Sequence, residues 1–285
     1  MSCGSSSLKK LHISDREGVG ICYSQCLACK LVFASRYMTD ECLQDFYVSE
    51  YSKLYRHHVL SDKKQSKLVR RIIGISEQWG LTSILDYGCG DASLLGELKP
   101  WFDSLLGVEF GHSYTTNCGI DIVSPEVFFS STGQKFDLIL LSQVLEHLSD
   151  PRELLGRLVR CLSDVGVIVI EVPGIYSWSN ILSNKRFLGQ FKLCHKTYFS
   201  GESLMALATP LNLRVLHYDD SARICLTRSK EVKGAPTDMG GWLADPLIKN
   251  TTLSISQRML LLTRLLYRKA WSYLERRILY SNGPR

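Results

Sequence analysis

The sequence predicts an α/β fold built on an open, mostly parallel sheet with helices on both faces. Short, nearly unbroken apolar runs recur between amphipathic helical segments. Runs without polar alternation are typical of strands that are covered on both sides. The stretch Ile84-Leu85-Asp86-Tyr87-Gly88-Cys89-Gly90 also places a Gly-x-Gly turn directly after one such run. This arrangement is typical of the carboxyl end of a parallel strand, where the backbone approaches a ligand closely.

The remaining elements can be assigned in order along the chain. A helix is expected over residues 66–79, where apolar residues recur at spacings of three and four and Gly80 ends the pattern. Buried strands are expected at residues 83–87, 104–110, 120–123, 136–142 and 166–172. Further helices are expected at residues 92–98, 151–162 and 202–211. A short polar turn joins two last strands, 213–218 and 223–227, which are therefore expected to be antiparallel.

Composition and patterning divide the chain into four expected regions. They are a cysteine-containing, zinc-knuckle-like front with a Tyr-rich helix (1–65), the α/β domain (66–230), a linker (231–250) and a basic amphipathic helix (251–285). The chain is 45% hydrophobic and 22% charged, as in globular proteins. It has no signal-peptide pattern and no run of about 18 apolar residues. We therefore expect a cytoplasmic protein with reduced cysteines, and a membrane-peripheral location is the alternative.

Positive charge is concentrated at the C-terminal end. Residues 251–285 carry seven Lys and Arg residues and one Glu, which equals the net charge of +6 for the whole chain. The remainder is neutral, so no nucleic-acid partner is expected. The same segment is rich in Leu, which predicts a helix that packs on the body or on a second subunit. Contact with an anionic membrane surface is the alternative.

The Gly-x-Gly turn indicates a site for a nucleoside. Glu109 lies 19 residues after Gly90 and ends the next strand, where a carboxylate can accept hydrogen bonds from both ribose hydroxyls. A dinucleotide site calls for a third small residue three positions after Gly90, and Ser93 is a poor match. Asp86 in the turn suits a cationic group better than a pyrophosphate. These features favour S-adenosylmethionine over a nicotinamide dinucleotide.

Four ordered blocks carry a family resemblance. They are Leu85–Gly90, Gly107–Glu109, Phe136–Ile139 and Val144–Pro151. Together they resemble class I S-adenosylmethionine-dependent methyltransferases, and the last block is similar to the branch that includes ubiquinone-type O-methyltransferases. The resemblance covers about residues 66–230. It implies a Rossmann-like, seven-stranded sheet whose last hairpin is antiparallel.

The resemblance also implies cofactor-binding roles. The residues it assigns to the methionine part are Asp86, Gly88, Cys89, Gly90, Ser142 and Gln143. Glu109, followed by Phe110, is assigned to the ribose. Three residues compete for the adenine: Asp121, Ser124 and Glu126.

The cysteines at the front suggest a structural zinc. Cys26 and Cys29 have the Cys-x-x-Cys spacing of zinc ligands, and Cys3 and Cys22 are their available partners. This part of the chain resembles the zinc-binding front of sugar C-methyltransferases. That pattern has two Cys-x-x-Cys-Gly pairs, whereas here the first is reduced to Cys3 and Lys30 replaces the second glycine. Four thiolates would leave no open position on the metal, and unliganded cytosolic thiols are the alternative.

Two histidines are candidate catalytic bases. Methyl transfer to a hydroxyl requires alignment of the nucleophile and removal of its proton. His147 follows the fourth strand, and His195 lies in an aromatic-rich segment, residues 174–200, that is expected to cap the acceptor pocket. Sugar C-methyltransferases have a Glu-His pair where this chain has Cys194-His195. The loss of that carboxylate disfavours carbanion chemistry on a keto-sugar. Structural roles, in capping and packing, are the alternatives for both histidines.

The sequence therefore predicts an S-adenosylmethionine-dependent methyltransferase acting on a small polar acceptor, with His195 or His147 as the base. A hydroxyl of a sugar or nucleotide-sugar in glycan biosynthesis is the expected acceptor. Tyr47, Tyr51 and Tyr55 would close over the site or pack a helix. The alternatives are C-methylation of a keto-sugar and a non-catalytic, cofactor-binding scaffold subunit.

Overall fold

The computed structural model describes residues 3–14, 20–35, 39, 42, 62–110, 114–116, 119–131, 133–174, 191–192, 194–219 and 222–234. Several sequence predictions fall outside these residues. They concern the three tyrosines at 47, 51 and 55, most of the expected cap, most of the linker and the whole of segment 251–285.

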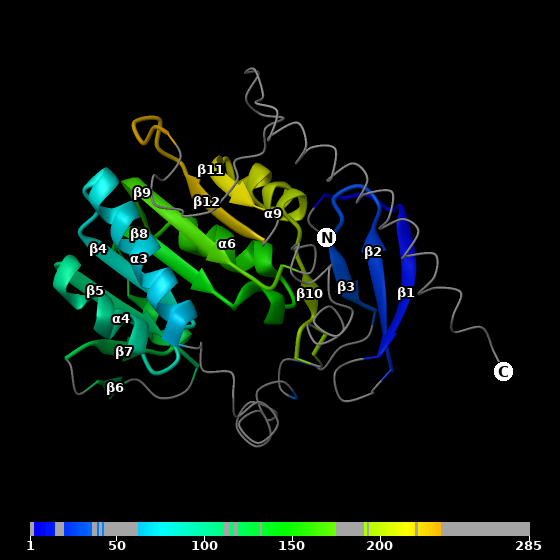
Figure 1. Ribbon diagram of the computed structural model, residues 1–285, viewed down its shortest axis with the longest axis horizontal. Coiled ribbons are helices and arrows are strands. Elements are labelled where there is room, and N and C mark those ends of the chain that lie inside the picture. Colours follow the sequence, from blue (N-terminus) through cyan, green and yellow to red (C-terminus); the bar gives the residue numbers. More distant parts are fainter. Residues whose placement is uncertain are drawn as a thin grey trace.

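The larger sheet has the strand order β11-β12-β9-β8-β4-β5-β7-β6 (Figure 1). Its strands are β4 (Ser83–Tyr87), β5 (Ser104–Val108), β6 (Tyr114–Thr115), β7 (Asp121–Val123), β8 (Phe136–Ser142), β9 (Leu162–Glu171), β11 (Arg214–Asp219) and β12 (Arg223–Thr227). The pairs among β7, β5, β4, β8 and β9 are parallel, and β12 is antiparallel to both β9 and β11. The predicted seven-stranded sheet with an antiparallel last hairpin is confirmed, and the two-residue β6 extends its edge.

Helices cover both faces of this sheet, as the apolar runs predicted. They are α3 (Asp62–Trp79), α4 (Ser93–Leu98), α5 (Pro125–Ser130), α6 (Pro151–Val159) and α9 (Gly201–Ala208), with short 3-10 turns η2 (Lys99–Trp101), η3 (Leu145–His147) and η4 (Thr209–Leu211). Alternate side chains of β8 enter two cores. Ile139 and Leu141 pack with α5, α6 and α9, whereas Leu138 and Leu140 pack with α3 and α4.

One predicted boundary is wrong. Residues 151–162 were expected to form one helix, but α6 ends at Val159 and β9 already begins at Leu162, four residues before the expected strand. Leu162 is buried in the same core as Leu155 and Leu158. Because the side chain is buried in either structure, apolar spacing alone could not distinguish the end of the helix from the start of the strand.

The front of the chain forms a second, four-stranded sheet with the order β1-β2-β3-β10. Its strands are antiparallel: β1 (Leu8–Ser14), β2 (Gly20–Cys26), β3 (Val32–Ala34) and β10 (Thr197–Tyr198). The sequence did not indicate these strands. Tyr23, Phe191 and Tyr198 pack in a small core of this sheet, with ring centroids 4.8–5.8 Å apart. The fourth strand of this sheet, β10, lies after β9 in the sequence, far from the other three strands.

The segment around Lys196 connects the two sheets. Its backbone N–H donates to the carbonyl oxygen of Glu146 in η3 at 2.8 Å, and its carbonyl oxygen accepts from the N–H of Ala34 in β3 at 2.8 Å. Ser200 Oγ donates to the carbonyl oxygen of Cys29 at 3.0 Å. Figure 1 shows β10 between the blue front strands and the green body.

None of the helices in the described part of the chain has the length and apolar character that a membrane-spanning helix needs.

Asp137 joins three strands at the amino edge of the larger sheet. Its Oδ2 accepts from the backbone N–H groups of Thr82 and Ser83 at 3.1 and 3.2 Å, and its Oδ1 accepts from Ser163 Oγ at 2.7 Å. Partial burial opposes ionisation, but these hydrogen bonds outweigh it and lower the pKa of Asp137. The carboxylate thus holds the starts of β4, β8 and β9 together.

Replacing this carboxylate should destabilise the fold. We expect Asp137→Ala to lower the free energy of unfolding by about 1–3 kcal/mol, because several donors lose their acceptor. Urea denaturation followed by circular dichroism measures this change. Asp164→Ala, which removes an exposed acid on β9, is the matched control. Equal stability of the two variants would contradict the assigned role.

Candidate active site

The Gly-x-Gly loop lies at the carboxyl end of β4, where the strand order reverses between β5 and β8. Gly88 has a φ of 84°, and a Cβ there would lie 2.4 Å from Val144 Cγ2. Only glycine therefore fits at this position. The N–H of Gly88 donates to the carbonyl oxygen of Val108 at 2.7 Å, which fixes the loop against β5. A Cβ on Gly90 would meet nothing within 4 Å, so the loop faces open space there.

Two carboxylates approach this loop. Glu109 Oε2 accepts from the N–H of Gly90 at 2.7 Å, and its Oε1 accepts from the N–H of Phe110 at 2.9 Å. Asp86 is buried, and its Oδ1 has no hydrogen-bond partner in the described part of the chain. Burial, with a contribution from the charge of Glu109, raises the pKa of Asp86 to about 7. A buried acid of this kind is stabilised by a cationic or hydrogen-donating ligand.

The other predicted cofactor residues surround the same edge. Phe110 is 60% exposed next to Glu109. Ser142 ends β8, and Gln143 follows it with a φ of 59°, held by its N–H donating to the carbonyl oxygen of Glu171 at 2.7 Å. Left-handed backbone is costly for a residue other than glycine and often marks a functional site. Cys89 is buried, and its sulfur lies between Gly107 and the carbonyl oxygen of Gly90, which is 3.8 Å away.

The three candidates for the adenine lie beyond β5, and each has a local structural role. Asp121 Oδ1 accepts from Thr115 Oγ1 at 2.6 Å. Ser124 is the N-cap of α5, where its side chain accepts from the N–H of Val127. Hydrogen bonds from Ser124 and from its own backbone lower the pKa of Glu126, which is exposed in the first turn. The geometry does not select one of the three.

The structure brings the two candidate bases together. The ring centroids of His147 and His195 are 4.7 Å apart, at an interplanar angle of 82°. His147 Nδ1 is 3.0 Å from the carbonyl oxygen of Cys194, and because a carbonyl oxygen only accepts, this nitrogen carries the proton. Burial, together with the charges of Lys192 and Lys196, lowers the pKa of His147 to about 4 despite that hydrogen bond. His147 is therefore a neutral imidazole near pH 7.

Two neighbours of these histidines were not assigned from the sequence. Glu146 is fully buried, and neither carboxylate oxygen has a hydrogen-bond partner among the described residues. Its Oε1 is 3.7 Å from His147 Nε2, and burial raises the pKa of Glu146 to about 8. Cys194 is also fully buried, and its sulfur lies within 4.8 Å of a ring nitrogen of each histidine. Each of the two directly precedes one of the candidate histidines in the sequence, and this adjacency could have identified them.

The front cysteines partly converge. The sulfurs of Cys3, Cys26 and Cys29 lie within 4.8 Å of one another, with Cys3 and Cys26 at 3.5 Å. Burial opposes ionisation of Cys26, but hydrogen bonds from Cys29 and Cys3 prevail and lower its pKa to about 7. Such a thiol is ready to bind a metal. Cys22 is not brought to this group: it lies four residues before Cys26 in β2, about 13 Å along an extended strand.

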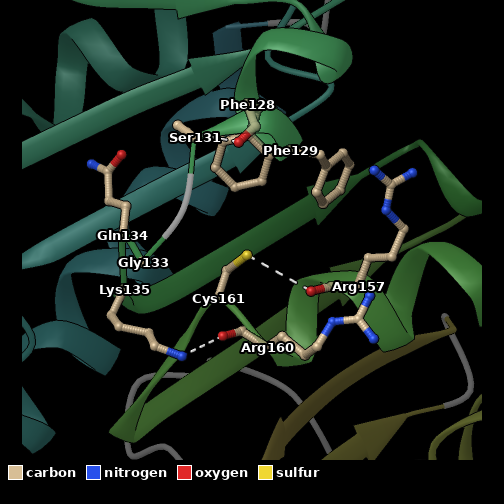
Figure 2. Close-up of a pocket in the computed structure, with 9 residues that line it drawn as sticks. All are labelled: Phe128, Phe129, Ser131, Gly133, Gln134, Lys135, Arg157, Arg160 and Cys161. Carbon is tan, nitrogen blue, oxygen red and sulfur yellow. Dashed lines mark hydrogen bonds between the residues drawn. The ribbon is translucent and has the colours of Figure 1, made fainter.

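A separate cavity of about 390 Å³ lies at the opposite edge of the larger sheet, where α6 ends and β8 begins (Figure 2). Its lining residues are Phe128, Phe129, Ser131, Gly133, Gln134, Lys135, Arg157, Arg160 and Cys161. Arg157 stacks on Phe129, with its guanidinium carbon 3.6 Å from the ring centroid. This cavity is distinct from the loop and from the two histidines.

The solved structures that match this chain include several methyltransferases. A SAM-dependent methyltransferase from Archaeoglobus fulgidus is 23% identical, with 58% of this chain and 75% of that chain covered and a TM-score of 0.46. One from Clostridium acetobutylicum ATCC 824 is 15% identical, with 64% and 97% covered and a TM-score of 0.44. The sugar N-methyltransferase KedS8 from Streptoalloteichus sp ATCC 53650 is 16% identical, with 63% and 93% covered and a TM-score of 0.45.

No curated protein matches this sequence. A family model described as "Methyltransferase domain" matches residues 51–218, which is more than half of the chain. The matched region contains the loop after β4, the acid after β5 and both histidines. The chain therefore belongs to the methyltransferase domain family, and it has the fold of the class I enzymes that use S-adenosylmethionine.

Proposed function

We propose that this enzyme transfers the methyl group of S-adenosylmethionine to a hydroxyl of a small polar acceptor, a sugar or nucleotide-sugar used in glycan synthesis. The observation that carries the proposal is the position of two groups at one sheet edge. The buried Asp86 lies near the carboxyl end of β4 and the loop of Gly88 and Gly90 follows that strand. The paired rings of His147 and His195 lie beyond the adjacent strand, β8. The first group suits a cationic methyl donor and the second suits an acceptor proton.

The donor side follows from the fit of these residues to the cofactor. The cofactor supplies a sulfonium-bound methyl group that a nucleophile displaces. Asp86 would neutralise the positive charge of the ammonium group in the methionine part of the cofactor. The backbone and polar atoms of the loop with Cys89, and of Ser142 and Gln143, would border the same part. Glu109 would accept from the ribose hydroxyls, since the N–H of Gly90 already orients its carboxylate. The exposed ring of Phe110 would cover the nucleoside.

The acceptor side depends on the histidine pair. His195 would accept the acceptor proton as the hydroxyl oxygen attacks, and His147, whose tautomer is set by the carbonyl oxygen of Cys194, would orient the ring of His195. The sugar class rests on the resemblance of the front to sugar methyltransferases. C-methylation of a keto-sugar is distinguished by deuterium exchange at the acceptor carbon. A scaffold subunit would bind the cofactor without turnover on any acceptor.

The front and the C-terminal segment complete the proposal. A zinc ion held by Cys3, Cys26 and Cys29 would fix the front sheet, with Cys22 requiring a shift of β2 to become the fourth ligand. Segment 251–285 would associate with a second subunit or with an anionic membrane surface. Either role suits an enzyme of the cytoplasm that works on glycan precursors.

Removal of the proposed base should abolish methyl transfer without weakening the binding of S-adenosylmethionine. We expect His195→Ala to abolish turnover while its affinity for S-adenosylmethionine, measured by calorimetry, stays within threefold of the wild type. His217→Gln, at a buried histidine in β11, should retain turnover within threefold. If His195→Ala retains turnover within threefold, the base lies elsewhere.

Replacing Asp86 by a neutral residue should stabilise the free protein and lower its affinity for S-adenosylmethionine. The carboxyl of Asp86 ionises near 3.8 when unfolded and near 7 when folded. The folded state thus holds a proton that the unfolded state releases, so its stability falls as pH rises through this interval. Asp86→Asn should raise Tm at pH 8 more than at pH 5 and lower the affinity for S-adenosylmethionine at least tenfold. Asp91→Asn, an exposed change in the same loop, should alter neither. Wild-type affinity in Asp86→Asn would contradict the assignment.

Metal analysis tests the zinc at the front. The purified wild-type protein should retain one equivalent of zinc more than Cys3→Ser, because that exposed thiol closes the cluster. Cys42→Ser, at another exposed cysteine, should leave the zinc content unchanged. Less than a tenth of an equivalent in carefully handled wild-type protein would refute this site.

A further inference from the structure

We propose that His147, Cys194 and His195 form a second metal site, with a ligand set that suits zinc, within the acceptor side of the enzyme. One ligand atom of each of these three residues lies within 4.8 Å of the other two. Ligand atoms on one tetrahedral zinc lie about 3.4–3.6 Å apart, given bond lengths of about 2.0–2.3 Å. The three ligand atoms are therefore at most about 1.4 Å farther apart than they would be on a bound zinc.

The hydrogen bond of His147 prepares it as a ligand. Its Nδ1–H donates to the carbonyl oxygen of Cys194 at 3.0 Å, so the lone pair of the neutral ring is on Nε2. A hydrogen bond of this kind fixes the tautomer and the ring direction of metal-binding histidines. Because the acceptor is the backbone of Cys194, the same contact also places two ligands next to each other.

Glu146 is a buried acid beside the three proposed ligands, near the positive charge of Lys192. This carboxylate is fully buried, and neither oxygen has a hydrogen-bond partner among the described residues. Its Oε1 is 3.7 Å from His147 Nε2, the nitrogen that bears the lone pair. Two such atoms repel each other unless a proton or a cation lies beside them. Zinc bound by one thiolate and two neutral imidazoles has a net charge of +1, which an ionised Glu146 would neutralise.

The ligand set determines which metal is favoured. A thiolate with two imidazoles suits zinc or copper, whereas magnesium and calcium prefer oxygen ligands. Three protein ligands leave a fourth position for water or an acceptor oxygen. The nearby Lys192 and Lys196 contribute positive charge, which opposes a cation here. A metal-bound thiolate of Cys194 would offset part of that charge. This site differs from the front cluster, whose ligands are cysteine sulfurs only.

Zinc at this site would inhibit methyl transfer. A nitrogen that holds a metal cannot accept a proton, so bound zinc would block the base. This consequence rests on the proposed role of His195, whereas the metal site itself does not.

Cobalt titration of the metal-free, full-length protein tests the site without any activity measurement. In Cys3→Ser, where the front cluster is incomplete, cobalt should bind at one equivalent and give a thiolate-to-cobalt charge-transfer band. Adding Cys194→Ser should abolish that band, and adding His147→Gln should weaken cobalt binding at least tenfold. Adding Cys161→Ser, at a half-buried cysteine that follows α6, should change neither result. Circular dichroism verifies that each variant is folded. Absence of the band in Cys3→Ser, or its persistence after loss of Cys194, would overturn the site.

A second measurement separates this inference from the proposed function. Zinc should inhibit turnover of Cys3→Ser at least tenfold, with affinity for S-adenosylmethionine unchanged within threefold, and a chelator should restore it. If cobalt does not bind but His195→Ala is inactive, the metal site is wrong and the proposed base stands. If cobalt binds and zinc leaves turnover unchanged, inhibition through His195 is wrong.

Discussion

The backbone of Lys196 makes the two hydrogen bonds on which the position of the histidine pair depends. Its N–H bonds to η3 of the methyltransferase body and its carbonyl oxygen bonds to β3 of the front sheet. Because β10 follows at once and pairs with β3, the chain is held on both sides at this point. Cys194 and His195, just before it, are thereby placed against His147. The front sheet thus positions one half of the histidine pair.

The donor side is built differently. It rests on the large sheet, where short backbone hydrogen bonds hold the loop after β4 against β5. Gly88 permits the close approach to Val144, and Glu109 is oriented by the loop itself. The loop proposed to bind the donor is thus held within one sheet, whereas the histidine pair proposed for the acceptor depends on contacts between two sheets.

Two buried acids lie where the chemistry is expected. Burial raises the pKa of both Asp86 and Glu146, and each has a carboxylate oxygen without a hydrogen-bond partner among the described residues. Such groups reduce the stability of the free protein and are commonly retained at functional sites because a ligand compensates them. Asp137, at the opposite edge, is fully hydrogen-bonded and stabilises the sheet instead.

The sequence by itself determined the large sheet and its donor loop, because apolar runs, the Gly-x-Gly turn and Glu109 are local patterns with a direct structural meaning. It did not distinguish the end of α6 from the start of β9, since Leu162 is buried in either case. Only the tertiary structure decided the front sheet, whose fourth strand, β10, comes from far along the chain. The same holds for the cluster of His147 and His195 with Cys194 and Glu146. Residues almost fifty positions apart met there through contacts between separate elements, which no local pattern encodes.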